Sequence, residues 1–443
     1  MNNKKYYSGW NNFPVQYGRM DKVHSIDELS NYIRKSTSTF IPVGNLKSYG
    51  DCVLNKKMAK YVGSKKIKFN KVKKTAIVSS NVLIGDLIRK TLPYGFFPPV
   101  VPGTKYVSIG GAIAADIHGK NHHIKGSFCN HVIWVDIIIS DGSIVRCSKS
   151  DNEELFRMTC GGMGLTGFII KAAIKMISID SHHIKQKTYV ANNLSDLFQL
   201  FIENQTKEYS VAWIDCTARR NRLGRGIILL GEFVKGKCEI NKNKLHDNHR
   251  FGIPFYFPDI FMNRFSISLF NSLYFYFSSL KDKQESIVSY DNYFFPLDKI
   301  SNWNRFYGAS GFIQYQFVLP LENSFEGLKI ILNLIAKYGQ ASPMAVLKLL
   351  GPENDNYLSF PMQGYTLAVD FKNCPSIFPL LKNLDKIVNY YGGRIYLAKD
   401  ARVSKDSFEK NYRKVNYFRN YRNVDIQKNK INFGSKQSSR LGL

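Results

Sequence analysis

Short apolar runs in the first part of the chain alternate with segments of helical spacing, and this pattern predicts strands and helices in turn. Ser25 and Glu28 stand three residues apart at the start of one such segment, which is the spacing of a capped helix start. The Asp141-Gly142 pair separates two strand-like runs and predicts a hairpin between them. The predicted strands are 39–43, 75–79, 131–139, 144–147 and 165–177, and a helix is predicted over 83–92.

The second part of the chain, from about residue 178, shows strand and helix signals in a defined order. Apolar residues from Leu328 to Ile335 recur at helical spacing, and Gly339 ends that helix. The order from 311 to 398 is strand, helix, strand, strand, helix, strand, which is the order of a split βαβ, ferredoxin-like unit. The pattern therefore predicts an α+β fold, and no internal repeat is evident. The predicted strands are 209–215, 226–233, 311–319, 345–350, 365–371 and 394–398, with a second helix over 377–391.

Two stretches interrupt this alternation. Lys235–Arg250 is basic and polar and predicts a mobile loop. The stretch 265–280 is apolar and aromatic, carries no charge, and is flanked by Arg264, Lys281 and Lys283. Serines and an asparagine interrupt it, so it lacks the roughly 18 uninterrupted apolar residues of a membrane span. A buried core helix is one interpretation, and a helix lying on a membrane surface is the one that we favour because of the flanking charges.

Length and charge indicate how many domains the chain has and which kinds of partner it binds. A chain of 443 residues predicts a large core and two domains. The net charge of +28 indicates an anionic partner such as anionic lipid or a phosphorylated substrate, although scattered lysines are equally typical of compositional drift. No nucleic-acid motif is present, so a nucleic-acid partner is not expected. The seven cysteines show no C-x-x-C pair and the start lacks an apolar signal core, so we expect reduced thiols in the cytoplasm.

Two glycine-rich loops between 101 and 176 carry the candidate chemistry. Gly110 and Gly111 precede an alanine-rich run and predict a helix N-terminus, where N–H donors and the helix dipole attract phosphate. Glycines also let the main chain approach a ligand closely. His118 and Lys120 follow at once. The pattern therefore indicates a diphosphate-bearing cofactor with polar chemistry beside it.

These loops resemble the flavin-binding domain of vanillyl-alcohol-oxidase-type flavoproteins. The strings that carry the resemblance are P-V-G-N-L-K-S-Y-G-D from Pro42, H-G-K-N-H-H from His118 and G-G-M-G-L-T-G from Gly161. More narrowly, the chain resembles the decaprenylphosphoryl-β-D-ribose 2′-oxidase family almost end to end, through A-W-I-D from Ala212, F-I-Q-Y-Q-F from Phe312 and G-G-R-I-Y-L-A-K-D from Gly392. The implied domains are a two-part FAD-binding domain over 10–178, a substrate-binding domain with an antiparallel, ferredoxin-like sheet and mobile basic and aromatic loops over 179–392, and a C-terminal segment over 393–443 that returns to the FAD domain.

The resemblance implies FAD as cofactor, held without a covalent bond. Many relatives carry a flavin-linked histidine in the first loop, whereas this chain has Lys47 there, which cannot form that link. The implied cofactor-binding residues are Pro42, Val43, Gly44, Asn45, Leu46, Lys47, Ser48, Tyr49, Gly50, Asp51, Cys52, Gly103, Ser108, Ile109, Gly110, Gly111, Ala115, Asp116, Ile117, His118, Ile170 and Tyr396.

The implied reaction is oxidation of the 2′-hydroxyl of a polyprenyl-phosphate ribose to a ketone, the first half of an epimerisation used in cell-envelope arabinose synthesis. A short-chain-dehydrogenase partner would reduce the ketone, and the protein would lie in the cytoplasm, peripherally on the inner membrane. Lys399 matches the catalytic lysine, and His118 would orient the sugar or tune the flavin. Without the resemblance, Lys399 is equally a surface lysine paired with Asp400. The implied substrate residues are Tyr49, Lys120, Trp213, Tyr307, Gln314, Gln316, Val346, Lys348, Thr366, Ala368 and Lys399.

Two positions depart from the family. Ala368 stands where relatives have a substrate-pocket cysteine, and Thr366 where they have an asparagine, so thiol-directed inhibitors would lose their target. Metal binding by His118, His122 and His123 is not expected, because no acidic or thiol partner stands nearby in the sequence.

Two other functions stay open at this point. One is an oxygen-using sugar or polyol oxidase of the same fold, which would act on a small soluble substrate and release peroxide. The other is a basic, non-enzymatic binding protein, which would be colourless.

Overall fold

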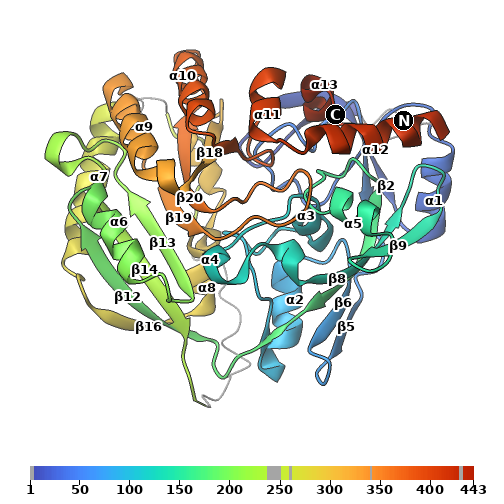
Figure 1. Ribbon diagram of the computed structural model, residues 1–443, viewed down its shortest axis with the longest axis horizontal. Coiled ribbons are helices and arrows are strands. Elements are labelled where there is room, and N and C mark those ends of the chain that lie inside the picture. Colours follow the sequence, from blue (N-terminus) through green and yellow to red (C-terminus); the bar gives the residue numbers. More distant parts are fainter. Residues whose placement is uncertain (1–3, 237–250, 259–261, 340–341, 429–432) are drawn as a thin grey trace.

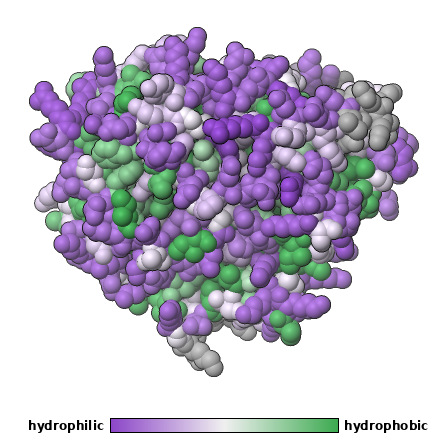
Figure 2. Space-filling view, viewed as in Figure 1, coloured by the Kyte–Doolittle hydropathy of each residue, from purple (hydrophilic) through white to green (hydrophobic). Residues whose placement is uncertain are grey.

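The computed structural model describes residues 4–236, 251–258, 262–339, 342–428 and 433–443. Figure 1 shows the first part of the chain on one side of the molecule and the large sheet of the second part on the other. Except for its first two residues, the predicted mobile loop Lys235–Arg250 lies outside the described residues. The face in Figure 2 is mainly hydrophilic, with apolar side chains between the polar ones.

The first part of the chain contains a four-stranded sheet of order β1-β2-β4-β3 and a five-stranded sheet of order β5-β6-β10-β8-β9. The predicted Asp141-Gly142 hairpin is confirmed, because β8 and β9 pair antiparallel. The strands are β1 Lys4–Ser8, β2 Val15–Val23, β3 Ile41–Pro42, β4 Lys57–Tyr61, β5 Ile67–Asn70, β6 Thr75–Ser79, β7 Phe96–Phe97, β8 Val132–Ile138, β9 Ile144–Ser148, β10 Phe168–Lys175 and β11 Ile177–Ser178. The helices are α1 Ile26–Arg34, α2 Ile84–Thr91, α3 Ile109–Ala114, α4 His122–Lys125 and α5 Glu153–Thr159.

The predicted start of α1 is also confirmed. The Ser25 hydroxyl accepts a hydrogen bond of 3.1 Å from the backbone N–H of Glu28. The Glu28 carboxylate reaches one residue further back than a capping box requires, and accepts from the backbone N–H of His24 at 2.8 Å.

The second part of the chain forms an eight-stranded sheet of order β16-β12-β14-β13-β19-β20-β18-β21. Its strands are β12 His183–Ala191, β13 Tyr209–Ile214, β14 Gly226–Phe233, β16 Glu285–Ser289, β18 Phe312–Pro320, β19 Ala345–Leu350, β20 Gly364–Lys372 and β21 Arg394–Ile395. A short pair, β15 Phe251–Gly252 and β17 Ile300–Ser301, lies outside this sheet. The helices are α6 Leu194–Glu203, α7 Arg264–Ser279, α8 Tyr290–Phe294, α9 Ser324–Tyr338 and α10 Ile377–Tyr390.

The predicted ferredoxin-like unit is confirmed by the strand order of its half of the sheet. Numbered along the chain, β18, β19, β20 and β21 stand in the spatial order 4-1-3-2, with every neighbouring pair antiparallel. The strands β12, β13, β14 and β16 stand in the same order in the other half, and β13 pairs with β19 to join the two. The fold thus holds two units of one strand order, which the sequence does not reveal because no residue pattern repeats between them.

The last predicted strand, 394–398, is shorter than expected. Only Arg394–Ile395 pair in the sheet, because the backbone then turns so that the N–H of Lys399 bonds to the carbonyl of Tyr396 at 3.0 Å. This turn ends the strand just before the predicted catalytic lysine.

Two helices cover opposite faces of the half-sheet β12–β14. Ala212 and Ile214 of β13 share a core cluster with Leu197 of α6, whereas Trp213 between them contacts Tyr274 of α7, with ring centres 4.7 Å apart. Successive side chains of a strand point to opposite faces, so α6 and α7 lie on opposite sides.

The C-terminal helices α12 Val415–Lys428 and α13 Lys436–Leu441 pack back onto the first part of the chain (Figure 1), whereas α11 Lys405–Asn411 packs against α10 and β21. Phe433 forms a β-bridge with Phe40, and their rings meet with centres 5.2 Å apart. The chain end therefore contributes to the core built around the first sheet.

Candidate active site

Two adjoining cavities of about 290 and 490 Å³ lie along the loop 44–48 and the start of α3. The smaller cavity extends along the first part of the chain, to Lys60, Asn81 and Gly164. The larger one reaches the strands β18, β19 and β20. Both are lined by Gly44, Asn45, Ser48, Val53, Ser108, Gly111 and Ala115, so together they form one continuous cleft.

The loop 44–48 offers a row of backbone donors to this cleft. Among the described residues, none accepts a hydrogen bond from the N–H groups of Gly44 through Ser48. Leu46 has a left-handed backbone with φ 51°, and alternation of right- and left-handed residues turns successive N–H groups toward one point. A Cβ at Gly44 would overlap the Ser108 hydroxyl, so the close approach of the two loops requires glycine. This loop fits the pyrophosphate of the dinucleotide that the sequence predicts.

The predicted helix after the Gly110-Gly111 pair does form, as α3, but its first N–H groups are already bonded. The N–H of Ile109 donates to Val82 and that of Gly110 to Ser80, while that of Gly111 donates to the Ser108 hydroxyl at 3.3 Å. Phosphate binding at the start of α3 stays a prediction, although the first N–H groups of this helix already have protein partners. The backbone N–H groups of the loop 44–48 have no acceptor among the described residues, whereas those at the start of α3 donate to neighbouring segments.

Lys399 enters the larger cavity from the turn after β21. Its Nζ lies 3.4 Å from the centre of the Tyr49 ring, which is near enough for a cation–π contact. Burial lowers the pKa of the Lys399 ammonium to about 7, although the Asp370 carboxylate opposes the shift; Lys348 adds to it. An amine that loses its proton near pH 7 is suited to act as a general base.

Asp370 is a member of this site that the sequence analysis missed. Its carboxylate accepts a hydrogen bond of 2.5 Å from Gln314 and one of 3.5 Å from the Tyr307 hydroxyl. Burial raises the pKa of Asp370, while the hydrogen bond from Gln314 and the charge of Lys399 oppose that shift. The spacing from Ala368 was a usable signal, because residues two apart on one strand share a face.

A chain of hydrogen bonds fixes the tautomer of His118. The Thr366 hydroxyl donates to the carbonyl of Phe317 at 2.8 Å, so its oxygen can only accept from the Gln316 amide at 3.2 Å. The group of Gln316 that faces Thr366 is therefore its NH₂, and the same NH₂ lies 3.0 Å from His118 Nε2. Nε2 must then accept, which leaves the proton on Nδ1.

The Nδ1–H of His118 has no hydrogen-bond partner among the described residues, although it is buried. Burial and the neighbouring cations lower the pKa of His118 well below its usual range, so the ring stays neutral. A buried, unpaired donor costs free energy unless a ligand accepts from it. His118 lines the larger cavity, so a ligand bound there is one acceptor that would satisfy this N–H.

Two more buried lysines, Lys348 and Lys120, lie near the site. Lys348 lines the larger cavity, and burial lowers the pKa of its ammonium to about 8. Lys120 is held away from the cavity lining by a hydrogen bond to the carbonyl of Tyr293, and burial lowers its pKa to about 7. The cations together disfavour a positively charged ligand and favour an anionic one.

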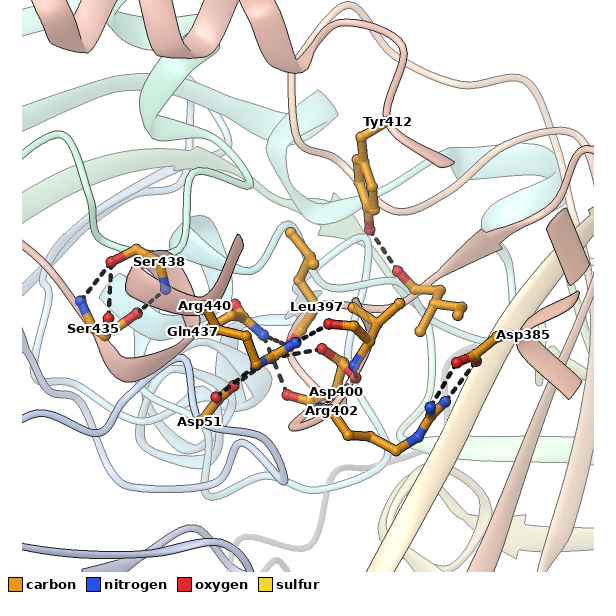
Figure 3. A network of polar contacts seen from close by, with 12 residues as sticks. Asp51, Asp385, Leu397, Asp400, Arg402, Tyr412, Ser435, Gln437, Ser438 and Arg440 are labelled. Atoms are coloured by element: carbon orange, nitrogen blue, oxygen red, sulfur yellow. Dashed lines mark hydrogen bonds and ion pairs between the residues drawn. The ribbon is translucent and has the colours of Figure 1, made fainter. Parts of the chain in front are cut away.

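The C-terminal helix α13 joins the turn of Lys399 to Asp51, which follows the loop 44–48 (Figure 3). Arg440 donates to both oxygens of Asp51, at 2.8 and 3.1 Å, and to Asp400 at 2.8 Å. Gln437 of the same helix donates to the carbonyls of Leu397 and Asp400. The Asp400 carboxylate therefore pairs with Arg440, whereas Lys399 lines the larger cavity and is not a surface lysine.

The remaining predicted residues fall into two groups. The cofactor residues that line at least one cavity are Pro42, Val43, Gly44, Asn45, Leu46, Lys47, Ser48, Tyr49, Cys52, Gly103, Ser108, Gly110, Gly111, Ala115, Ile117, His118 and Tyr396. The substrate residues that do so are Tyr49, Gln314, Gln316, Val346, Lys348, Ala368 and Lys399. Those that line neither cavity are Gly50, Asp51, Ile109, Asp116, Ile170, Lys120, Trp213, Tyr307 and Thr366.

Several predicted residues that line neither cavity form hydrogen bonds that hold other parts of the site in place. The Asp116 carboxylate accepts from Asn354 at 2.6 Å and from the Cys129 N–H at 2.9 Å, which anchors the segment that follows β19. Thr366 and Tyr307 hold Gln316 and Asp370 in the same indirect way. Cavity-lining residues that the sequence analysis missed include Trp10, Lys60, Tyr106, Asp298, Trp303 and Asp370.

The histidines after His118 serve the structure. His122 Nδ1 accepts from the N–H of Gly351 at 3.0 Å, and His123 Nε2 lies 2.9 Å from the carbonyl of Lys207. Within the described part of the chain, no three His, Cys, Asp or Glu side chains are grouped as a metal ion would need.

Comparison with known proteins bears on this cleft. Residues 17–148 match the family model of an FAD binding domain, a span that includes the loop 44–48 and α3. The decaprenylphosphoryl-β-D-ribose oxidase of Mycolicibacterium smegmatis is 34% identical over 358 residues, covering 79% of this chain and 77% of the relative. A Streptomyces coelicolor protein from the mprA 5′ region is 26% identical over 82% of this chain and its own full length. Cytokinin dehydrogenase 5 of Arabidopsis thaliana is 30% identical over 29% of this chain and 22% of its own.

Proposed function

The chain belongs to the decaprenylphosphoryl-β-D-ribose oxidase family of FAD-dependent oxidoreductases, and on that premise we propose that it oxidises the 2′-hydroxyl of a polyprenyl-phosphate ribose to a ketone. The observation that carries this proposal is the position of Lys399, a buried amine with a pKa lowered to about 7. It lies in the cavity that the donor loop 44–48 also lines. A base and a flavin cradle thus share one cavity, as oxidation of an alcohol requires.

The residues present fit FAD on three observations. The loop 44–48 supplies free N–H donors for the pyrophosphate, and the cleft continues from there into both cavities. The buried Nδ1–H of His118 waits for an acceptor. When bound, FAD accepts the hydride that leaves the alcohol carbon.

The chain's own residues then have distinct parts in the reaction. Lys399 takes the proton of the hydroxyl group, and His118 donates its Nδ1–H to a ligand oxygen. Gln314 stays beside Asp370 at 2.5 Å and orients the sugar from the sheet. Lys348 retains most of its charge at pH 7, because the pKa of its ammonium is about 8, and supplies a cation for the phosphate of the substrate.

The wider context forms part of the same proposal. The ketone is the first half of an epimerisation in cell-envelope arabinose synthesis, and a short-chain dehydrogenase reduces it afterwards. A lipid-linked substrate requires a membrane surface, and we infer that the protein works in the cytoplasm on the inner membrane. Residues 10–178 and 393–443 form the FAD-binding domain and 179–392 the substrate domain, which the pairing of Phe40 with Phe433 supports.

Anaerobic addition of a polyprenyl-phosphate ribose to the FAD-loaded protein tests the proposal. The flavin absorbance should bleach, and the product should carry a 2′-ketone by mass spectrometry. If only small free sugars or polyols bleach it, and air then yields peroxide in proportion, the chain is a soluble-substrate oxidase and the proposal is wrong.

A further inference from the structure

Helix α7, Arg264–Ser279, turns its apolar side to solvent. Phe265 is 85% exposed and Phe277 60% exposed, which is unusual for residues of this size on one helix. From Phe265 the exposed residues recur at steps of three and four, so they form a continuous stripe. The exposed large side chains of α7 and its C-cap are Phe265, Leu269, Phe270, Leu273, Tyr274, Tyr276, Phe277 and Leu280.

The buried side of α7 carries Ile267 and one polar residue, Asn271. Asn271 is fully buried and donates to Asp215 at 2.9 Å and to the carbonyl of Ser342 at 3.2 Å. Arg225 pairs with the same aspartate at 2.7 Å and reaches the Ser272 hydroxyl at 3.1 Å. Turning the helix over would take the Asn271 amide away from the buried Asp215 carboxylate and would bring the buried Ile267 to the surface. The outward direction of the apolar stripe is therefore fixed by the fold.

The stripe adjoins the larger cavity. Tyr274 contacts Trp213, and Trp213 pairs across the strands with Val346, which lines that cavity. A second exposed aromatic segment, 251–257, borders the same cavity: β15 pairs with β17, and Ile300 of β17 lines that cavity. The exposed side chains of this segment are Phe251, Phe255 and Tyr256.

Charge identifies the occupant of this surface. Arg264 opens the helix, and Lys281 and Lys283 follow its end, whereas the stripe itself carries no charge. The two acidic residues nearby are engaged: Asp282 accepts from the Val190 N–H at 2.9 Å, and Glu285 pairs with Lys185 at 2.9 Å. A second copy of a chain of net charge +28 would be repelled from this basic rim, whereas an anionic lipid surface is attracted to it.

We propose that the apolar stripe of α7 and the aromatic segment 251–257 lie in the headgroup region of an anionic bilayer, with the basic residues at the phosphates. A helix whose aromatic face sinks into the interface between basic ends is the usual form of such contact. No helix in the described part of the chain is long and apolar enough to span a bilayer. The cavity would then open at the lipid surface, where a lipid-linked sugar can enter. This last consequence rests on the proposed function, but the docking does not.

Sedimentation with vesicles tests the docking. The FAD-loaded protein is mixed with vesicles of phosphatidylcholine alone, or of phosphatidylcholine and phosphatidylglycerol in equal amounts. We expect binding to the mixed vesicles, and about a tenfold or greater loss of affinity for a Phe265→Ser/Leu269→Ser/Phe277→Ser variant. Ile202→Ser/Tyr390→Ser removes two exposed apolar side chains of α6 and α10 and is the matched control, which should bind as the native protein does.

The outcomes separate the alternatives. Equal vesicle affinity of native protein and the α7 variant would overturn the proposal, and so would a native dimer that the variant abolishes, since a second copy would then be the occupant. To separate docking from chemistry, flavin reduction is measured with a water-soluble, short-prenyl phosphate ribose. The α7 variant should reduce at the native rate there and more slowly only with long-chain substrate in vesicles. Failure of every sugar to bleach the flavin, with vesicle binding intact, would refute the proposed function and leave the docking standing.

Discussion

The ammonium of Lys399 lies 3.4 Å from the centre of the Tyr49 ring, and the backbone joins the two segments beside this contact. The N–H of Tyr49 donates to the carbonyl of Ala398 at 3.0 Å, and the N–H of Asp51 donates to Asp400. The segment after the loop 44–48 and the turn that carries Lys399 are thus joined by their backbones. These contacts fix the position of Lys399 relative to that loop.

We expect FAD to be held without a covalent bond. The Nζ of Lys47 lies 3.4 Å from the centre of the Trp10 ring, and an amine there does not form the link that a histidine makes in other flavoproteins. Acid precipitation should release a yellow supernatant and leave a colourless pellet. Flavin fluorescence that stays with the denatured chain on a gel would contradict this prediction.

Asp370→Asn should shift the pH dependence of flavin reduction to lower pH. The rate rises with pH as Lys399 loses its proton, near pH 7 in the native protein because burial lowers its pKa to about 7. The Asp370 carboxylate raises the pKa of Lys399, so its removal lowers that pKa further. The midpoint of the rate in stopped-flow reduction should fall, and Asp370→Glu should restore it. An unchanged midpoint would mean that Asp370 serves only to hold Gln314.

Thr366→Val should disturb His118 without touching the cavity. Valine has the shape of threonine but leaves the Gln316 amide without its acceptor, so the amide no longer has to present NH₂ to His118. We expect roughly tenfold slower flavin reduction, the effect of one buried hydrogen bond. Thr366→Ser, which keeps the hydroxyl, is the control. Ring ¹⁵N shifts of His118 should show Nδ1–H in the native protein and in the serine variant, and a native Nε2–H tautomer would refute the assignment.

Arg440→Ala should destabilise the protein by breaking the link between Asp51 and Asp400. Asp51 and Asp400 are almost fully buried and share this one guanidinium, so its loss leaves two carboxylates unpaired. The free energy of unfolding should fall by about 3–5 kcal/mol, as when a buried pair is broken. Chemical denaturation measures the loss, and Arg419→Ala should cost less, because its partner Glu409 is 37% exposed. Equal losses would show that the bridge has no special part.

The sequence was sufficient for the strands and helices whose pattern is local. The strand 75–79 and the helix ended by Gly339 are found as predicted, because alternation and capping signals need no distant partner. The repeated strand order of the large sheet could not be seen, since it depends on which strands pair and not on residue identity.

The site was predicted less evenly. Resemblance identified the residues that line the cleft, such as Gln316 and Lys399, but not those that act through a neighbour. Arg440 lies 389 residues from Asp51 in the chain, so no local pattern connects them. Phosphate contacts were expected both on the loop of Pro42–Cys52 and at the start of α3. A glycine pair before a helix cannot show that Ser80 and Val82 accept from the first N–H groups of that helix.

The most direct test of the account is the rate of flavin reduction in Lys399→Ala, measured by anaerobic stopped flow with a polyprenyl-phosphate ribose. The variant should keep FAD and its visible spectrum, because Lys399 donates no hydrogen bond to the loop 44–48 among the described residues. Loss of a general base should slow reduction by about 10²–10⁴-fold. A variant that holds FAD and is reduced at nearly the native rate would show that Lys399 is not the base, and would contradict the central claim.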